Sequence, residues 1–288
     1  MGPVRVLSAS DGANVAYRLW RPGAPRRTIV AIHGLASNLT RWTEFAATTR
    51  LAETWDILSL DLRGHGGSLY RGRLGFDEWC ADIADLLAAE GVTETVLLGH
   101  CLGANVAMWF AHRQPLLVKG MVLIEPMFRR ALAGEMLKVV RFRPWIVALV
   151  PLLRGIAALG LHRRRLAMLD LAELDREARA AMSQDGGFPV SRYSSIREDL
   201  RGLPLAAYLQ DLLAVTGPLP DLRGLAAPSL ALLSAGTAFT DPEVTARALA
   251  ELPDCRIVRL DAQHWIPTEQ PEAMRRAIED WCDERFGR

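Results

Sequence analysis

The stretch TVLLGHCLGANVAMWFAHR (residues 95–113) joins a short apolar run to a helical pattern through a tight turn. Its centre is Gly99-His100-Cys101-Leu102-Gly103, a Gly-x-nucleophile-x-Gly arrangement in a strand–turn–helix context. Small residues flank such a turn because backbone and helix crowd together there. The following helix directs its positive N-terminal end at the same point. Cys101 is therefore the predicted nucleophile.

Continuous apolar runs recur along the chain on both sides of this turn. Runs of this length are typical of parallel strands that are buried on both faces. They cover residues 28–33, 56–61, 95–99, 118–125, 229–236 and 255–261. Helical patterns such as 76–91 separate them, and the runs 4–9 and 15–20 flank an Asp11-Gly12 turn as a hairpin would. The alternation predicts an α/β fold with a doubly wound parallel sheet.

One long segment interrupts this alternation. Residues 127–222 contain no strong strand pattern and are predicted to form several helices, with breaks at Pro or Gly positions such as Pro144 and Pro151. The predicted organisation is therefore a core in two parts, residues 1–126 and 223–288, with a helical cap inserted at 127–222.

Composition excludes several classes of protein. The 288 residues carry a net charge of +1, which argues against a nucleic-acid partner, and 50% hydrophobic residues argue against disorder. The four cysteines form no CxxC pair, so neither a disulfide framework nor a cysteine-rich zinc site is expected. Without an apolar leader at its start, the chain is predicted to be reduced and cytoplasmic.

The predicted cap is unusual in its charge and its hydropathy. Residues 129–165 contain nine basic residues and one acidic residue, Glu135. One interpretation is a solvated basic face, and the other is a docking surface for an acidic carrier protein at Arg163, Arg164 and Arg165. The stretch 145–161 is too short and too interrupted to span a bilayer, so membrane contact is not expected.

Three further motifs occur along the chain together with the turn at Cys101. His33-Gly34-Leu35 follows an apolar run, Asp61-Leu62-Arg63-Gly64-His65-Gly66-Gly67-Ser68 follows another, and His264 lies in LDAQHWIPTEQPEAM. Together with the turn, they resemble the α/β-hydrolase superfamily in type and order over nearly the whole chain. The resemblance implies a mostly parallel eight-stranded sheet with helices on both faces and an inserted helical cap.

The resemblance also implies roles for individual residues. The Leu35 and Leu102 amides would form the oxyanion hole, and His264 would be the general base. Phe239, Trp265 and His100 are candidates to line the substrate pocket. No cofactor and no metal ion are expected, because none of the motifs cradles a phosphate or places ligands at metal spacing.

Two positions depart from the family pattern. Most members have Ser where this chain has Cys101, although cysteine nucleophiles occur in dienelactone hydrolases, polyhydroxyalkanoate synthases and some carrier-protein thioesterases. A cysteine acyl-enzyme is a thioester, which raises the odds of acyl transfer. The acid is the second departure, because Phe239 stands at its usual position. Asp241 is the preferred triad acid, although it also suits the N-cap of a helix at 242–252, and Glu125 is the alternative.

The sequence therefore predicts a hydrolase of a small-molecule ester, thioester or lactone that works through a Cys-His-acid triad and a covalent acyl-enzyme. An acyltransferase or cyclase, which passes the acyl group from Cys101 to an amine, alcohol or thiol, is the second hypothesis. A lyase, an isomerase or a scaffold on the same fold is the third.

Overall fold

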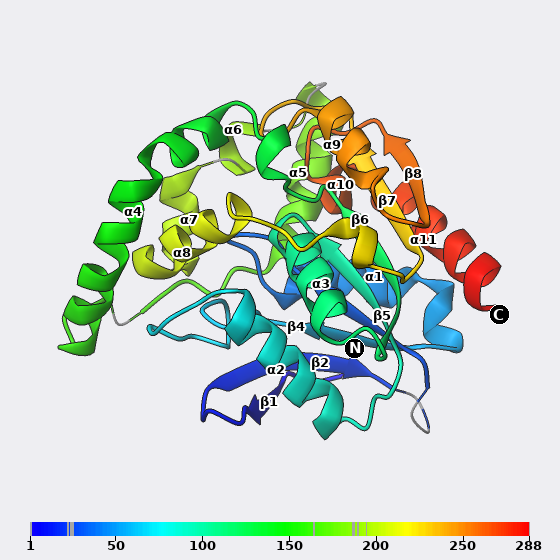
Figure 1. The fold of residues 1–288 in the computed structure, drawn as a ribbon, viewed down its shortest axis with the longest axis horizontal. Helices are drawn as coiled ribbons and strands as arrows, with labels where there is room; N and C mark the ends of the chain where they lie inside the picture. The colour runs from blue at the N-terminus through cyan, green and yellow to red at the C-terminus, as the bar shows by residue number, and fades with distance from the viewer. Residues whose placement is uncertain are drawn as a thin grey trace.

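An eight-stranded sheet forms the centre of the molecule (Figure 1). The computed structural model describes residues 2–21, 23, 26–163, 165–185, 188, 190–193 and 195–287. The strands are β1 (Arg5–Ser8), β2 (Asn14–Trp20), β3 (Thr28–Ile32), β4 (Asp56–Leu60), β5 (Thr95–His100), β6 (Val118–Ile124), β7 (Ser229–Ser234) and β8 (Cys255–Leu260). Their order is β1-β2-β4-β3-β5-β6-β7-β8. Strand β2 is antiparallel to both of its neighbours, and all other neighbouring pairs are parallel.

The sheet confirms the fold class that the apolar runs predicted. Each of the six runs forms one of the parallel strands, and every residue of β3, β4, β5 and β7 is buried. The predicted hairpin is β1–β2, and Gly12 occupies its turn with a φ of 82°, a left-handed conformation that suits glycine.

Helices cover both faces of the sheet. Outside the segment between β6 and β7, they are α1 (Thr43–Thr48), α2 (Phe76–Ala89), α3 (Leu102–Arg113), α9 (Pro242–Leu249), α10 (Ile266–Glu269) and α11 (Pro271–Phe286), with short 3₁₀ turns at η1 (Leu39–Trp42) and η2 (Arg50–Glu53). Apolar residues of α2, α3 and α9 belong to one core cluster, and those of α1 and α11 belong to the other. The two clusters lie on opposite faces of the sheet, which is the doubly wound arrangement.

Within the described residues, the predicted cap segment consists of helices joined by loops and contains none of the strands of the sheet. Between β6 and β7 lie η3 (Arg129–Ala131), α4 (Glu135–Ala158), α5 (Leu171–Asp185), α6 (Val190–Tyr193), α7 (Ile196–Gly202), α8 (Leu205–Val215) and η4 (Leu222–Gly224). Figure 1 shows most of these helices above and to the left of the sheet. They cover the side of the sheet where the parallel strands end, which is where ligands bind in α/β sheets of this type.

Helix α4 differs from the sequence-based prediction. Breaks were predicted at Pro144 and Pro151, yet α4 continues through both residues. Each proline removes a backbone hydrogen bond and disfavours a straight helix. Both rings are exposed, and the opposite side of α4 packs against α8, so packing holds the helix together along a curved path at the left of Figure 1.

Candidate active site

Cys101 lies in the turn between β5 and α3, as the sequence predicted. Its φ of 52° and ψ of −113° are strained for a residue with a side chain, and it is the N-cap of α3. Its N–H donates to the Ile124 carbonyl of β6 over 2.9 Å, and its carbonyl accepts from Ala104 over 3.1 Å. These bonds on both sides of the residue hold the turn in its strained conformation.

The two glycines of the turn are required by close approach of backbone. A Cβ on Gly99 would lie 2.3 Å from the Gly103 carbonyl oxygen, and a Cβ on Gly103 would lie 2.2 Å from the Ile32 carbonyl oxygen. Neither neighbour is a flexible side chain, so neither can move away cheaply. The steric reason that the sequence suggested for small residues here is therefore present in the structure.

A second segment, at the end of β3, meets the turn at Cys101. His33 holds this segment in shape, because its Nδ1–H donates to the Gly34 carbonyl over 2.8 Å and its Nε2 accepts from the Leu62 N–H over 3.0 Å. Burial lowers the pKa of His33 well below its usual value, which keeps the ring neutral for this pair of bonds. A Cβ on Gly34 would lie 3.3 Å from the Cβ of Cys101.

The predicted oxyanion donors stand on these two segments. Leu35 directly follows Gly34, and Leu102 is the first residue of α3, where helical N–H groups have no partner within the helix. Both amides thus belong to backbone that meets at Cys101. Their contact with a substrate oxygen stays a prediction.

His264 lies in the loop between β8 and α10. Glu269 of α10 fixes this loop: its carboxylate accepts from the backbone N–H groups of Gln263, His264 and Trp265 over 2.9–3.2 Å. Glu269 is part of the terminal motif around His264, but its place in that motif does not by itself indicate this role. Three backbone bonds to one carboxylate make it a positioning residue for His264.

The carboxylate that contacts the His264 ring belongs to Glu125. Its Oε2 lies 3.0 Å from Nδ1 of His264, and its Oε1 accepts from the Ser234 N–H of β7 over 2.5 Å. Glu125 directly follows β6, has a φ of 50°, and is buried. A non-glycine residue with positive φ is uncommon, and here that conformation places the carboxylate between β7 and the imidazole.

The other side of the His264 ring faces Cys101. Since Nδ1 contacts Glu125, Nε2 is the ring nitrogen left to interact with the Cys101 side chain. Burial disfavours the imidazolium, but the hydrogen bonds with Cys101 and Glu125 outweigh it and raise the pKa of His264 to about 10. The arrangement is a continuous chain from Cys101 through His264 to Glu125.

The position of Asp241 corrects the preferred choice of acid. Its Oδ1 accepts from the N–H groups of Glu243 and Val244 over 2.8 and 3.0 Å, which makes it the N-cap of α9. A carboxylate committed to two backbone donors at a helix start is not available to orient an imidazole. Of the two acids considered, the structure places Glu125 at His264.

The predicted pocket residues surround His264 with rings. Phe239 lies 4.8 Å from the imidazole between ring centroids, Trp265 lies 5.5 Å away, and His100 lies 5.3 Å away. His100 also contacts the His264 carbonyl through Nε2 over 3.1 Å, so it packs beside the turn and supports the histidine loop. Burial lowers the pKa of His100 well below its usual value, and the neighbouring His264 adds to this.

Cap residues close over these rings. Phe188 and Tyr193 pack against Trp265 at centroid distances of 5.2 and 5.6 Å. Cys101 is 8% exposed and His264 is 4% exposed. Cys101 is therefore covered in this conformation, and a ligand must displace part of the cap or of the rings to reach it.

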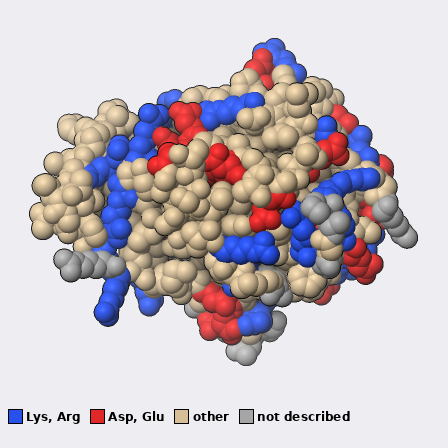
Figure 2. Space-filling view, turned by 90° about the horizontal axis from the view of Figure 1, so that it is seen from below, with Lys and Arg blue, Asp and Glu red and all other residues tan. Residues whose placement is uncertain are grey.

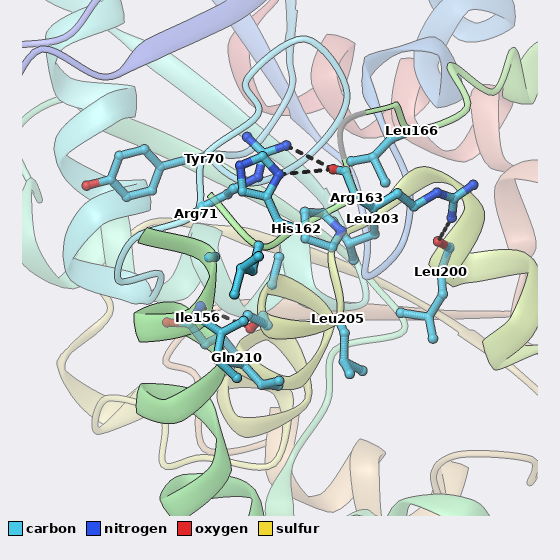
Figure 3. Close-up of a pocket in the computed structure, with 16 residues that line it drawn as sticks. Tyr70, Arg71, Ile156, His162, Arg163, Leu166, Leu200, Leu203, Leu205 and Gln210 are labelled. Carbon is cyan, nitrogen blue, oxygen red and sulfur yellow. Dashed lines mark hydrogen bonds between the residues drawn. The ribbon is translucent and has the colours of Figure 1, made fainter. Parts of the chain in front are cut away.

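A separate apolar cavity of about 260 Å³ lies within the cap (Figure 3). Helices α4, α7 and α8 line it together with the loop at Tyr70 and Arg71. Figure 3 shows Arg71, His162 and Arg163 gathered at one side of it, where the Arg163 carbonyl contacts the other two side chains. None of its lining residues belongs to the Cys101 site, so the cavity is distinct from the candidate catalytic centre.

The arginines of the predicted docking surface lie at the molecular surface where the structure describes them. Arg163 and Arg165 are exposed, and Arg164 lies outside the described residues. Among the described residues, no group of three or more His, Cys, Asp or Glu side chains is placed to hold a metal ion. None of the described helices combines the length and the apolar character needed to cross a bilayer.

Known proteins resemble this chain in sequence over part of its length. An sn-1-specific diacylglycerol lipase from Xenopus tropicalis is 29% identical over 117 residues, which are 41% of this chain and 37% of that protein. A 2-succinyl-6-hydroxy-2,4-cyclohexadiene-1-carboxylate synthase from Serratia proteamaculans is 34% identical over 101 residues, 35% of this chain and 38% of that protein. The matches thus span well under half the length of these curated relatives.

Solved structures resemble the chain over its whole length. A hydrolase from Pseudomonas aeruginosa has a TM-score of 0.69 at 22% identity and covers 100% of this chain and 99% of its own. An enol-lactonase from Burkholderia xenovorans has a TM-score of 0.69 at 20% identity, covering 96% and 99%. At such identities the likeness shows the fold. The family model described as alpha/beta hydrolase fold matches residues 27–271, and the chain belongs to this family.

Proposed function

We propose that this protein is an acyl hydrolase in which Cys101 is the nucleophile, His264 the general base and Glu125 the acid that orients it. The observation that carries the proposal is the position of the His264 ring, which is held between Cys101 and the Glu125 carboxylate at a strained strand–helix turn. A nucleophile, a base and an orienting group in this order are the general signature of covalent catalysis.

The first half of the reaction forms the acyl-enzyme. The thiol proton passes to His264 Nε2, because the raised pKa of His264 favours the imidazolium, and Sγ of Cys101 then attacks the acyl carbonyl carbon. The carbonyl oxygen becomes an oxyanion, which the Leu35 and Leu102 amides stabilise. When the carbonyl re-forms, the bond to the leaving group breaks, and the imidazolium gives its proton to that group. The product on the enzyme is a thioester.

The second half of the reaction releases the acid. A water molecule attacks the thioester carbonyl while His264 takes one of its protons, and the S–C bond then breaks with return of that proton to Sγ. Glu125 keeps the ring in the orientation that both proton transfers need. Its second oxygen is fixed by the Ser234 N–H, so the carboxylate cannot turn away from the imidazole.

The proposed substrate class is an ester, thioester or lactone with an apolar part. Phe239 and Trp265 stand beside His264, and the partly buried Leu35 stands at the turn, so the reacting group would be surrounded by apolar side chains. The names of a partial relative, a diacylglycerol lipase, and of a structural neighbour, an enol-lactonase, agree with this class.

Intact-protein mass spectrometry with candidate acyl donors tests the covalent step. We expect an added acyl mass on the peptide that contains Cys101 and no such mass in Cys101→Ala. Cys255→Ala is the matched control, because Cys255 is a free and partly exposed cysteine away from the site. An adduct that persists in Cys101→Ala and disappears in Cys255→Ala would refute the proposed nucleophile.

Acyl transfer is the second candidate, because an acyl-enzyme on Cys101 would be a thioester, which amines, alcohols and thiols attack as well as water. A bound amine, alcohol or thiol would then compete with water for the acyl group. A reaction with donor and amine together, analysed for amide and free acid, separates transfer from hydrolysis: amide in excess over the uncatalysed control indicates a transferase.

A non-acyl reaction is the third candidate. One partial relative is named a synthase and not a hydrolase, which is consistent with this class. Turnover of a substrate by Cys101→Ala at the wild-type rate would favour this class, since a covalent route needs the thiol.

A further inference from the structure

Helix α4 presents two different faces. One face packs on α8, where Arg143 donates to the Leu213 carbonyl over 2.8 Å and Val150 is buried. Positions three and four residues apart along a helix share a face, so the residues in contact with the body of the protein leave the opposite side of α4 uncovered. That side decides what else this helix contacts.

The uncovered side carries a stripe of large apolar residues. Trp145 is 75% exposed and Leu159 is 78% exposed. The stripe, at helical spacing along one side, consists of Phe142, Trp145, Leu149, Leu152 and Leu159, all of them exposed, whereas Ile156 lines the cavity of Figure 3. A contiguous run of this kind is uncommon on a freely soluble surface and marks a contact site.

Basic residues stand at both ends of this stripe. Arg141 and Lys138 lie about one and two turns before Trp145 on the same helix, and Arg163 and Arg165 follow the end of α4; all four are exposed. The only acidic residue between positions 129 and 165 is Glu135. Figure 2 shows the same combination at the left of the molecule, where a broad area without charge is bordered by a band of Lys and Arg side chains.

We propose that the outer face of α4 binds an anionic phospholipid surface. The apolar stripe enters the boundary between headgroups and acyl chains, and the basic residues at its two ends contact the negatively charged headgroups. A helix that lies in the membrane plane with one apolar side and cationic flanks binds in this manner. The proposal concerns a surface away from Cys101 and does not depend on the reaction proposed above.

This inference departs from the expectation drawn from the sequence. There, membrane contact was disfavoured because residues 145–161 cannot span a bilayer, and no described helix spans one. Lying on a membrane is a different requirement from crossing it, since only one side of the helix must be apolar. The sequence does not show which side of α4 is covered by α8.

Charge and chemistry favour lipid over two other occupants. In an antiparallel pair of two copies, Lys138 and Arg141 of one α4 would face Arg163 and Arg165 of the other, and like charges would repel. An acidic carrier protein would satisfy the basic residues but would leave the apolar stripe without a matching surface. An anionic lipid surface supplies both the negative charge and the apolar layer.

Sedimentation of the full-length protein with vesicles tests the proposal. We expect binding to phosphatidylcholine vesicles that contain phosphatidylglycerol, weaker binding to phosphatidylcholine alone, and release at high salt. Leu152→Glu should lower the partition coefficient about tenfold or more, because it places a charge in the apolar stripe. The matched control is Leu116→Glu, since Leu116 is also an exposed leucine (84%, against 60% for Leu152) and lies in the loop before β6.

A fluorescence measurement locates the contact. Five of the eight tryptophans are buried, whereas Trp145 is 75% exposed within the stripe. Brominated acyl chains should quench its emission in bound protein, and Trp145→Phe should remove most of that quenching while the protein still sediments with vesicles. Thermal unfolding of each variant by circular dichroism confirms that the fold is intact.

Three results would overturn the proposal. The first is equal vesicle binding by Leu152→Glu and Leu116→Glu. The second is a concentration-dependent dimer in analytical ultracentrifugation that Leu152→Glu abolishes, without binding to anionic vesicles. The third is binding to a purified acidic acyl carrier protein, weakened by charge reversal at Arg163 and Arg165, again without vesicle binding. Activity enters none of these measurements, so the fate of the proposed reaction does not affect the outcome.

Discussion

Among the residues that the structure describes, two buried histidine–carboxylate pairs occur, and they differ in what else contacts the histidine. In one, His264 lies 3.0 Å from Glu125 between two loops of the core. In the other, His65 lies 2.9 Å from Asp211 of α8, at an angle that falls short of a well-formed hydrogen bond, and this pair joins the core to the cap. All four side chains are buried.

The surroundings of each ring separate a catalytic arrangement from a structural one. The His264 ring has a thiol on its other side, and its carboxylate partner is fixed by the Ser234 N–H. The His65 ring instead packs edge-on against the His33 ring, with 4.8 Å between the ring centroids. Among the described residues, no hydrogen bond fixes the carboxylate oxygens of Asp211. A raised histidine pKa is common to both pairs. The position of His264 beside Cys101, the proposed nucleophile, distinguishes the two pairs chemically.

Removing one carboxylate charge from each pair gives the largest expected contrast. Glu125→Gln should lower kcat/KM on the order of 10²-fold or more, because the imidazole loses the group that orients it and stabilises its positive charge. Asp211→Asn should change kcat/KM only a few-fold but should lower the free energy of unfolding by about 1–3 kcal/mol, because His65 loses its buried partner. Steady-state kinetics and urea unfolding of both variants measure this contrast.

The assignment of the two pairs is wrong if Asp211→Asn loses activity and Glu125→Gln does not. A full loss of activity in Asp211→Asn with an unchanged midpoint of unfolding would place the second pair in the catalytic machinery. Wild-type kinetics in Glu125→Gln would remove Glu125 from the triad. A folded-state control is the near-ultraviolet circular dichroism spectrum, which reports whether either variant has lost the packing of its aromatic residues.

The pH dependence of stability is the second contrast. For His65, burial disfavours the charged ring, but the nearby Asp211 carboxylate outweighs burial and raises the pKa. A histidine with a raised pKa contributes its full stabilisation below its unfolded value of 6.5, and the contribution is lost as the pH rises through the folded value. For His264 that loss extends to about pH 10. Wild-type stability should therefore decline between about pH 6.5 and 10.

Single histidine variants separate the contributions of the two pairs. His264→Asn and His65→Asn should each flatten the plot of unfolding free energy against pH over that window. His112→Asn should leave it unchanged, because His112 is exposed and belongs to neither pair. Urea unfolding at intervals between pH 6 and 10 supplies the data. Parallel plots for all three variants would mean that neither buried pair gains its proton on folding.

Local patterns were sufficient to predict the fold and most of the candidate site. The strand–turn–helix at Cys101, the loop at His33 and the terminal His264 motif each carry their information within a few consecutive residues. The orienting acid does not, because the contact of Glu125 with His264 depends on the placement of β6, β7 and the loop after β8 side by side. Asp241 carries a strong local signal, an acid before a proline, and that signal belongs to the start of a helix.

The cap was less accessible to sequence reasoning for the same physical reason. The cap helices carry apolar residues on both their inner and their outer sides. Periodicity alone does not show which of these two sides packs against another helix. Asp211 was missed because it is a single acid within the apolar pattern of 205–215. A lone charged residue on the apolar side of a helix indicates a buried partner, and this signal pointed to a pair without naming His65.

The smallest expected effect concerns the acid that the sequence favoured. Asp241→Ala should lower the free energy of unfolding by about 1 kcal/mol, because two backbone N–H groups at the start of α9 lose their acceptor. Asp241→Ser should recover most of that loss, since a serine hydroxyl also caps a helix, although it cannot stabilise an imidazolium. Both variants should keep kcat/KM near the wild-type value. A large loss of activity in both, with stability unchanged, would show that Asp241 reaches His264 during turnover and that the capped conformation is only one of its states.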